Sequence, residues 1–396
     1  MSRLWEKGLP LDERVLRFTA GEDHVLDARL VSYDIRASIA HAEMLAAQKL
    51  LSDEDCAAIR DGLTELEQSF NAGDWQITLE NEDVHTALET RLTQKIGDAG
   101  GRLHLGRSRN DQVLTALRLY LRDAATDLRT RVSDLRQSTI AIADRQGDVV
   151  LPGYTHMQHA MPSTVALWCG GFDEAFADAM AGLKAAGRRI DKNPLGSAAG
   201  YGTPGLPLAR EHTTRALEFA TTQSPVTAAQ LSRGKAESGL IFEITLLLQD
   251  VGRLAADLLL FYTQEFAFIT LAANTTTGSS IMPQKRNPDV LELLRSSSAT
   301  AQACLDESLM ITAKLPSGYQ RDLQRLKAPL FRAIDLAIDS VDIMAYVLDG
   351  IRFVPENIHL DEGIFATAEA YQLVADEGMP FRDAYRRIAR RYAKKN

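Results

Sequence analysis

Leu240-Ile-Phe-Glu-Ile-Thr-Leu-Leu-Leu-Gln-Asp-Val-Gly-Arg-Leu-Ala-Ala-Asp-Leu-Leu-Leu260 is the most apolar run of the sequence, and the fold class follows from it. Glu243, Asp250 and Arg253 interrupt the run, which is typical of a buried helix and not of a membrane span. Its large apolar side chains recur with the period of a helix, at Ile244, Leu247, Leu248, Val251, Leu254 and Leu258. The expected helix, residues 230–266, is apolar around most of its circumference and needs neighbours on several sides.

Two arrangements supply those neighbours. One is a helix bundle larger than one chain can close, which implies an oligomer. The other is a single long helix docked on its own domain. No proline lies between Pro10 and Pro152 or between Pro225 and Pro283, so both tracts permit long helices. A second long helix is expected over residues 112–145. Strict alternation of apolar and polar residues is scarce, and the sequence therefore predicts an all-α protein.

Length and helix pattern divide the chain into three expected parts. With 396 residues, of which 45% are hydrophobic and 24% charged, the chain is long enough for two or three domains. Residues 1–105 are expected to form an N-terminal helical domain with a helix start at Ser52. Residues 106–348 form the central helix-bundle domain, and residues 349–396 form a short C-terminal helical domain.

Charge and cysteine content narrow the class of protein. A net charge of −9 argues against a nucleic-acid binder, which needs a basic surface. Cys56, Cys169 and Cys304 lie far apart and predict neither a disulfide framework nor a metal site, which favours a reducing compartment. Because the N-terminal residues 1–8 carry no apolar signal segment, the expected location is the cytoplasm, with no membrane contact.

The segment Gly278-Ser-Ser-Ile-Met-Pro-Gln-Lys-Arg-Asn-Pro-Asp289 predicts a catalytic lid between two helices. Its serines, Lys285 and Asn287 are suited to bind an anion that develops during a reaction, and a serine there is a candidate base if it is activated. Glu292, in the next helix, is placed to orient a histidine. The alternative is an ordinary polar connection between helices.

Three further polar clusters lie beside glycine or proline at helix ends. In residues 104–111, two arginines with Ser108 and Asn110 offer donors for carboxylates; the alternative is a helix cap formed by Asn110 or Asp111. In the loop of residues 152–162, His156 is a candidate acid or base beside Thr155, and His159 is interpreted as structural. In residues 317–327, Gln324 and Lys327 share one face if the segment is helical; the alternative is a solvated helix start.

No cluster has the ligand density of a metal site, and neither a phosphate-binding glycine loop nor a dinucleotide fingerprint is present. The expected chemistry is therefore acid–base catalysis on a polyanionic small molecule, without metal or cofactor.

These motifs together resemble a known family. Residues 278–289 resemble the signature of the fumarase/aspartase superfamily, and the ending Gln-Lys-Arg-Asn-Pro-Asp is close to the version in the argininosuccinate lyase family. Gly106-Arg-Ser-Arg-Asn-Asp-Gln112 is still more specific to that family. Pro152-Gly-Tyr-Thr-His-Met-Gln158 agrees with it, as do Asp322-Leu-Gln324 and Glu82-Asp-Val-His85, all in the family's order.

The resemblance implies a fumarase/aspartase-like fold, in which central long helices form a twenty-helix core in a homotetramer, flanked by two smaller helical domains. Each active site would then combine motifs from three subunits. The implied reaction is the reversible elimination that cleaves argininosuccinate to L-arginine and fumarate in arginine biosynthesis.

The resemblance also implies roles for individual residues. Ser279 matches the base, Lys285 and Asn287 match the groups that stabilise the intermediate, and His156 matches the acid, held by Glu292. The residues that match contacts to substrate carboxylates are Ser108, Arg109, Asn110 and Thr155. Those that match contacts to the arginine end are Tyr319, Gln324 and Lys327.

The chain departs from the family pattern near these motifs. Gly21 stands where relatives often have a substrate-binding serine, Leu105 stands where the family has threonine, and Ser232-Arg-Gly-Lys-Ala-Glu237 replaces Asp-Arg-Asp-Phe. Two alternatives therefore stay open: a catalytically idle structural or regulatory homologue, and a related fumarate-releasing lyase with another leaving group.

Overall fold

The computed structural model describes residues 12–392. The N-terminal residues on which the expectation of no signal segment rests lie outside the described part, as do the ends of the first and last expected domains. By contacts the chain forms two compact units. Unit 1 comprises residues 1–129, 182–245 and 300–335, and unit 2 comprises residues 130–181, 246–299 and 336–396. The boundaries of these two units differ from those of the three expected domains. The division into three domains therefore stays a prediction.

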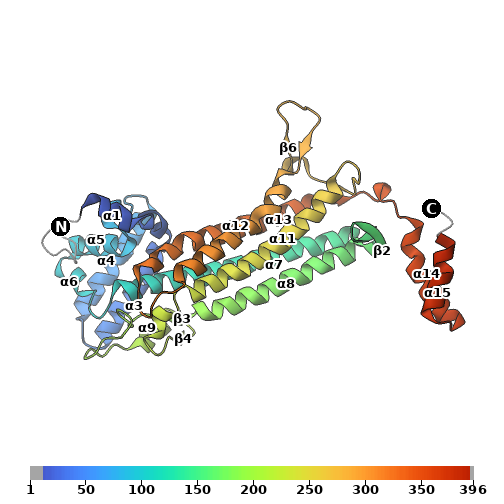
Figure 1. The fold of residues 1–396 in the computed structure, drawn as a ribbon. Helices are drawn as coiled ribbons and strands as arrows, with labels where there is room; N and C mark the ends of the chain where they lie inside the picture. The colour runs from blue at the N-terminus through green and yellow to red at the C-terminus, as the bar shows by residue number, and fades with distance from the viewer. Residues whose placement is uncertain (1–11, 393–396) are drawn as a thin grey trace. The chain divides into compact units, whose positions relative to one another are not determined.

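Five long helices dominate the chain and confirm the predicted fold class (Figure 1). They are α7 (Arg109–Gln146), α8 (Val165–Ile190), α11 (Lys235–Tyr262), α12 (Asp289–Thr312) and α13 (Lys327–Gly350). The helix expected over residues 112–145 is α7, and that expected over residues 230–266 is α11. The latter begins later than expected because a turn over residues 232–234, in which Gly234 has a φ of +81°, separates it from the preceding short helix.

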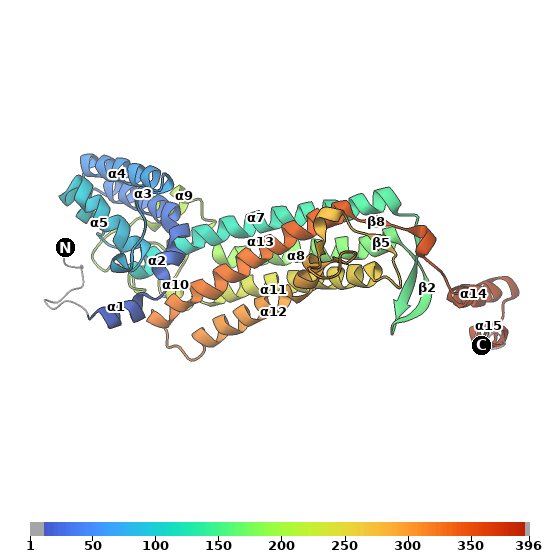
Figure 2. The ribbon, with the colours of Figure 1, turned by 90° about the horizontal axis from the view of Figure 1, so that it is seen from above.

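Unit 1 contains the shorter N-terminal helices, of which α3, α4 and α5 pack against one another (Figure 2). Its helices are α1 (Glu13–Ala20), α2 (Asp23–Leu26), α3 (Val31–Ala47), α4 (Asp53–Asn71), α5 (Val84–Ile96), α6 (Asp98–Arg102), α9 (Arg210–Ala216) and α10 (Ala228–Leu231). Helix α4 starts where Ser52 predicts, because its hydroxyl accepts the N–H of Asp55 at 3.1 Å. One parallel pair of short strands, β3 (Lys192–Asn193) and β4 (Thr221–Thr222), lies in this unit.

Short 3₁₀ helices connect these elements. They are η1 (Asp27–Leu30), η2 (Leu79–Asn81) and η4 (Arg321–Leu326) in unit 1, and η3 (Ala273–Thr275), η5 (Pro355–Asn357) and η6 (Glu362–Phe365) in unit 2. The turn η4 leads directly into α13, so Gln324 and Lys327 lie on consecutive helical turns, as predicted.

Unit 2 carries an antiparallel hairpin where the sequence predicts a loop. Strands β1 (Val150–Thr155) and β2 (Gln158–Thr164) pair with Pro152 opposite Pro162, so the two prolines lie within the strands and do not bracket a loop. Proline is tolerated here because a two-stranded ribbon is all edge, and an edge strand can leave the missing N–H unpaired. The expectation of a loop over residues 152–162 was therefore wrong.

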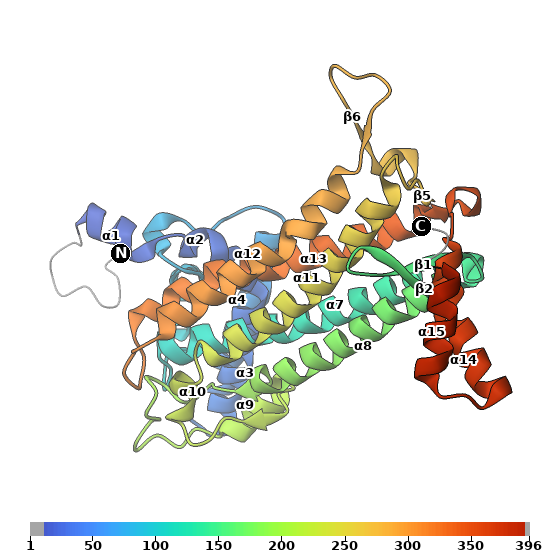
Figure 3. The ribbon, with the colours of Figure 1, turned by 45° about the vertical axis from the view of Figure 1, so that its right-hand side comes forward.

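Further short elements complete unit 2. They are β5 (Ile269–Thr270), β6 (Thr277–Gly278), β7 (Arg286–Asn287), β8 (Arg352–Phe353), α14 (Ala366–Glu377) and α15 (Phe381–Tyr392). Strands β6 and β7 pair and close the base of the predicted lid, which projects from between α11 and α12 in Figures 1 and 3.

The core includes the side chains of the predicted helical repeat. All six positions of that repeat in α11, from Ile244 to Leu258, are fully buried. In the described part of the chain, no helix is both long and apolar enough to cross a membrane.

Candidate active site

The residues predicted for the site fall into two groups, each within one unit. Unit 1 holds Ser108, Arg109, Asn110, Tyr319, Gln324 and Lys327. Unit 2 holds Thr155, His156, Ser279, Lys285, Asn287 and Glu292.

A cavity of about 40 Å³ in unit 1 brings together four of the predicted residues. Arg109, Tyr319, Gln324 and Lys327 line it, and they come from α7, the segment before η4, η4 and α13. This confirms that Gln324 and Lys327 share one face. Ser108 and Asn110 are half-buried and do not belong to the lining.

Lys327 is the most buried of these groups. Its ammonium lies 2.6 Å from Asp27 Oδ1 and 2.8 Å from Asp23 Oδ2. Burial by itself lowers the pKa of Lys327, but the charges of Asp27 and Asp23 outweigh burial, and the pKa is raised. Lys327 is therefore charged, and it joins the start of α13 to the segment that contains α2 and η1.

Asp23 shares that ammonium with Asp27 and titrates differently from an exposed acid. Burial raises the pKa of Asp23 to about 6, the charge of Lys327 lowers it, and the charge of Asp27 raises it. Burial is the largest of these causes, and it explains why Asp23 holds a proton at a higher pH than usual.

Arg109 is held by the start of α5. Its guanidinium donates to Thr86 Oγ1 at 2.7 Å and lies 3.3 Å from Glu82 Oε2 and 3.4 Å from Asp83 Oδ2. Burial acts to raise the pKa of Asp83, but the charges of Arg109 and His85 and the hydrogen bond from the backbone of Thr86 all act to lower it, and the pKa is lowered. The resulting ion cluster fixes the orientation of Arg109 at the cavity wall.

The cap of α7 differs from both alternatives that the sequence left open. The Ser108 hydroxyl accepts the N–H of Asn110 at 3.3 Å, so Ser108 caps the helix, and neither Asn110 nor Asp111 does. Asp111 instead accepts the N–H of Ser108 at 2.9 Å, which completes a reciprocal arrangement. The Asp111 carboxylate also accepts the N–H groups of Gly196 and Ala198, at 2.9 and 2.8 Å.

Gln324 and Arg321 are bound to backbone next to Gly21. The Gln324 amide donates to Thr19 O at 2.8 Å and to Ala20 O at 3.2 Å, and Arg321 donates to Thr19 O at 2.9 Å. The segment that departs from the family at Gly21 therefore lies against a residue predicted for the arginine end.

Sequence reasoning did not select several residues that the structure places in this group. They are Asp23, Asp27, Glu82, Asp83 and Arg233. Glu82 and Asp83 belong to a motif that carried the family resemblance, and Arg233 belongs to a segment noted as a departure, so a signal existed for these three. Nothing in the sequence pairs Asp23 or Asp27 with Lys327.

In unit 2, His156 lies at the tip of the β1–β2 hairpin. Thr155 pairs with Gln158, so His156 and Met157 form a two-residue turn, and their φ values are +54° and +61°. Positive φ at both central residues is what a type I′ turn requires, and glycine or asparagine normally supplies it. Thr155 and His156 are exposed, while His159 pairs with Tyr154 OH at 3.0 Å, in line with a structural role.

The lid carries Ser279, Lys285 and Asn287. The Ser279 Oγ accepts the N–H of Met282 at 3.1 Å, with Ile281 N at 3.4 Å. Lys285 is exposed, and the Asn287 amide donates to Gly278 O at 3.4 Å across the base of the lid. Glu292 is exposed on the first turn of α12, and within residues 12–392 no hydrogen bond or ion pair joins it to His156.

We expect Asp23→Asn to remove a pH-dependent contribution to stability. The folded-state pKa of about 6 exceeds the usual 3.8, so folding binds a proton, and the free energy of unfolding contributed by Asp23 falls as pH rises from about 4 to about 6. The loss is about 1–3 kcal/mol. Urea unfolding at several pH values measures it. Asp322→Asn, which replaces an exposed carboxylate in η4, is the control, and an unchanged slope in Asp23→Asn contradicts the prediction.

Comparisons with known proteins show the family of the chain. Residues 11–303 match the family model described as lyase. The chain is 43% identical to an argininosuccinate lyase of Sorangium cellulosum, over 98% of this chain and 90% of that protein. It is 39% identical to one of Thermotoga neapolitana, over 99% and 98%.

Solved structures confirm the fold class. EDDS lyase in complex with formate matches with a TM-score of 0.81 at 26% identity, over 96% of this chain and 76% of that chain. A class II fumarase from Schistosoma mansoni matches with a TM-score of 0.79 at 18% identity, over 96% and 93%, which shows a common fold. The chain belongs to the argininosuccinate lyase family of the fumarase/aspartase superfamily.

Proposed function

We propose that this protein is a carbon–nitrogen lyase that cleaves argininosuccinate reversibly to L-arginine and fumarate in arginine biosynthesis. The observation that carries the proposal is the match at about 40% identity, over nearly the whole chain, to relatives named argininosuccinate lyase. The unit 1 cavity supports it, because its wall holds both cations and carboxylates and thus suits the carboxylate and ammonium of an amino acid.

Ser279 is the base in this proposal. Backbone N–H groups that point at its Oγ stabilise negative charge there, which is the activation that a serine base needs. The Oγ removes a proton from the succinyl carbon next to a carboxylate, and the electron pair moves into that carboxylate. Lys285 and Asn287 stabilise the two negative charges that result.

His156 is the acid. As the electron pair returns to form the fumarate double bond, the carbon–nitrogen bond breaks, and the departing guanidinium nitrogen takes a proton from His156 directly or through water. Glu292 orients the imidazole. An exposed turn suits this role, because it can carry the ring into a site that other segments complete.

The remaining residues bind substrate. Ser108, Arg109, Asn110 and Thr155 contact the succinyl carboxylates, and Asn287 assists them. Tyr319, Gln324 and Lys327 contact the arginine end. No cofactor takes part in these steps.

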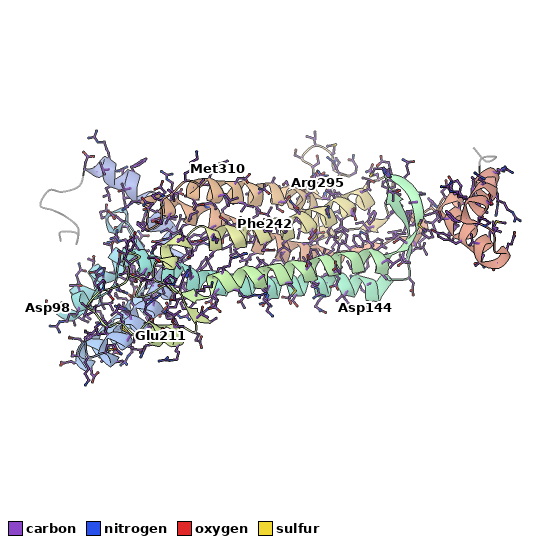
Figure 4. All side chains as sticks on the ribbon, turned by 60° about the horizontal axis from the view of Figure 1, so that its bottom comes forward. Asp98, Asp144, Glu211, Phe242, Arg295 and Met310 are labelled. Atoms are coloured by element: carbon purple, nitrogen blue, oxygen red, sulfur yellow. The ribbon has the colours of Figure 1, made fainter. Side chains whose placement is uncertain are left out.

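We further propose a homotetramer with shared active sites. Apolar side chains are exposed along two of the long helices, among them Phe242 at 47% and Leu246 at 40% on α11, and Leu293 at 71% and Met310 at 74% on α12. Phe242 and Met310 are labelled in Figure 4. Rows of exposed apolar residues mark protein interfaces. The exposed positions of His156 and Lys285 also suit a site that neighbouring subunits complete.

The proposed location is the cytoplasm, without nucleic-acid partners. The described cysteines Cys56, Cys169 and Cys304 are all free and buried, as suits a reducing compartment, and the net charge is −9.

A related lyase with another leaving group is the second candidate, and the departures at Gly21 and in residues 232–237, beside the predicted arginine end, favour it.

Incubation with argininosuccinate, followed by fumarate absorbance, tests the activity. We expect fumarate and L-arginine in equal amounts. The same assay with adenylosuccinate, aspartate and malate tests the second candidate. No fumarate from argininosuccinate at high protein concentration contradicts the first proposal, and no fumarate from any of them supports an idle homologue.

Ser279→Ala and His156→Asn are each expected to lower kcat by roughly two to four orders of magnitude, because each removes one proton-transfer group. Stopped assays at saturating substrate measure the loss. Ser280→Ala, which replaces the neighbouring exposed serine, is the matched control. A variant that sediments differently from the wild type owes its loss to assembly, and that result contradicts the assigned role.

Phe242→Glu is expected to dissociate the tetramer, since it places a charge in a buried apolar contact. Sedimentation velocity measures the change. Val15→Glu, on the exposed face of α1, is the control and leaves the assembly intact. A wild type that sediments as a monomer overturns the proposed assembly.

A further inference from the structure

Among the residues that line the unit 1 cavity, Arg233 is the one with buried side-chain donors that lack a hydrogen-bond partner within residues 12–392. It is 6% exposed, and its Nε and Nη1 have no hydrogen-bond partner within residues 12–392. Its Nη2 donates to Leu323 O at 3.4 Å, which is a long bond. Buried donors without a partner cost free energy, so a ligand group that fills them gains affinity.

The other cations of the cavity already have partners within the protein. Lys327 lies between two carboxylates, Arg109 contacts Thr86, Glu82 and Asp83, and Arg321 donates to a backbone carbonyl. An incoming anion therefore finds unfilled donors at Arg233.

The charge around Arg233 is incompletely balanced. Arg118, Arg233 and Glu237 are all buried, and Glu237 is the carboxylate beside two guanidinium groups. Glu237 Oε1 lies 3.5 Å from Arg233 Nε, too far for a hydrogen bond, while its Oε2 accepts the N–H of Gly234 at 2.8 Å. Burial lowers the pKa of Arg118 to about 10, Glu237 raises it, and Arg233 lowers it. The group as a whole carries a surplus positive charge.

The free space matches a small anionic group. A volume of about 40 Å³ holds about three water-sized groups, which is the size of a carboxylate and smaller than a guanidinium on its chain. The same wall carries Asp23, Glu82 and Asp83. A ligand that brings a carboxylate and an ammonium on one carbon satisfies both signs of charge.

We propose that Arg233 binds the α-carboxylate of the arginine end of the substrate and so determines specificity for an amino acid at that end. The proposal rests on the proposed function. Of the parts of argininosuccinate, the arginine end alone joins a carboxylate to a free ammonium. Arg233 binds and positions this end and takes no part in proton transfer.

The test compares ligands that differ only in that carboxylate. KM and kcat are measured with argininosuccinate and with its analogue made from agmatine, and inhibition constants are measured for L-arginine and agmatine. Arg233→Met is expected to raise KM for argininosuccinate and the inhibition constant of L-arginine on the order of 10- to 100-fold, the value of a charge-assisted pair. Values for the two agmatine ligands change less than about threefold, and kcat stays close to that of the wild type.

Two further variants separate binding from folding. Arg233→Lys keeps the charge and restores part of the preference for L-arginine. Arg233→Met combined with Glu237→Gln removes both buried charges and so keeps the balance; it is expected to lack the preference while folding normally. Arg325→Met replaces an exposed arginine that does not line the cavity and serves as the control.

An equal loss for L-arginine and agmatine overturns the proposal, as does recovery of the preference in the double variant. Absence of fumarate from the wild type contradicts the proposed function instead. In that case calorimetric titration of wild type and variants with L-arginine and agmatine still decides the role of Arg233.

Discussion

The buried contact of Lys327 with Asp23 and Asp27 sets the geometry of the whole cavity. A lysine at this depth is stable only when carboxylates compensate its charge, and removal of one partner from such a buried group costs about 3–5 kcal/mol. The contact spans 300 positions of the sequence and holds α13 against α2 and η1. Gln324, one turn earlier, and Arg109 line the same cavity as Lys327.

The sequence predicted the helical framework well because that information is local. The apolar repeat in α11 and the proline-free tract before Pro152 act over a few turns of one helix. The β1–β2 hairpin was missed for the complementary reason. Its strands contain two prolines and are largely exposed, so neither alternation nor composition marked them. Only the structure shows that the chain reverses at His156 and Met157 and that the two strands pair.

The candidate site shows the same difference between local sequence patterns, which can be recognised, and contacts between distant segments, which cannot. Arg109, Tyr319, Gln324 and Lys327 were found because they belong to dense polar motifs, and the structure brings them to one cavity. Their acidic partners lie in distant segments, and charge pairing across such separations leaves no trace in one sequence. The roles of Ser279 and His156 stay predictions, because their neighbours in the described chain are backbone groups or solvent.

The left-handed turn at the hairpin tip lowers the stability of the hairpin but places a residue proposed for catalysis there. A β-hairpin of this kind folds most readily with glycine or asparagine at its centre, and a residue with a Cβ costs roughly 1–2 kcal/mol in that conformation. Selection for thermal stability alone would therefore replace His156 and Met157. A chain that retains an imidazole there has a less stable turn but carries a candidate proton donor at the exposed tip of the hairpin. Engineered stabilisation of this hairpin should therefore leave position 156 unchanged.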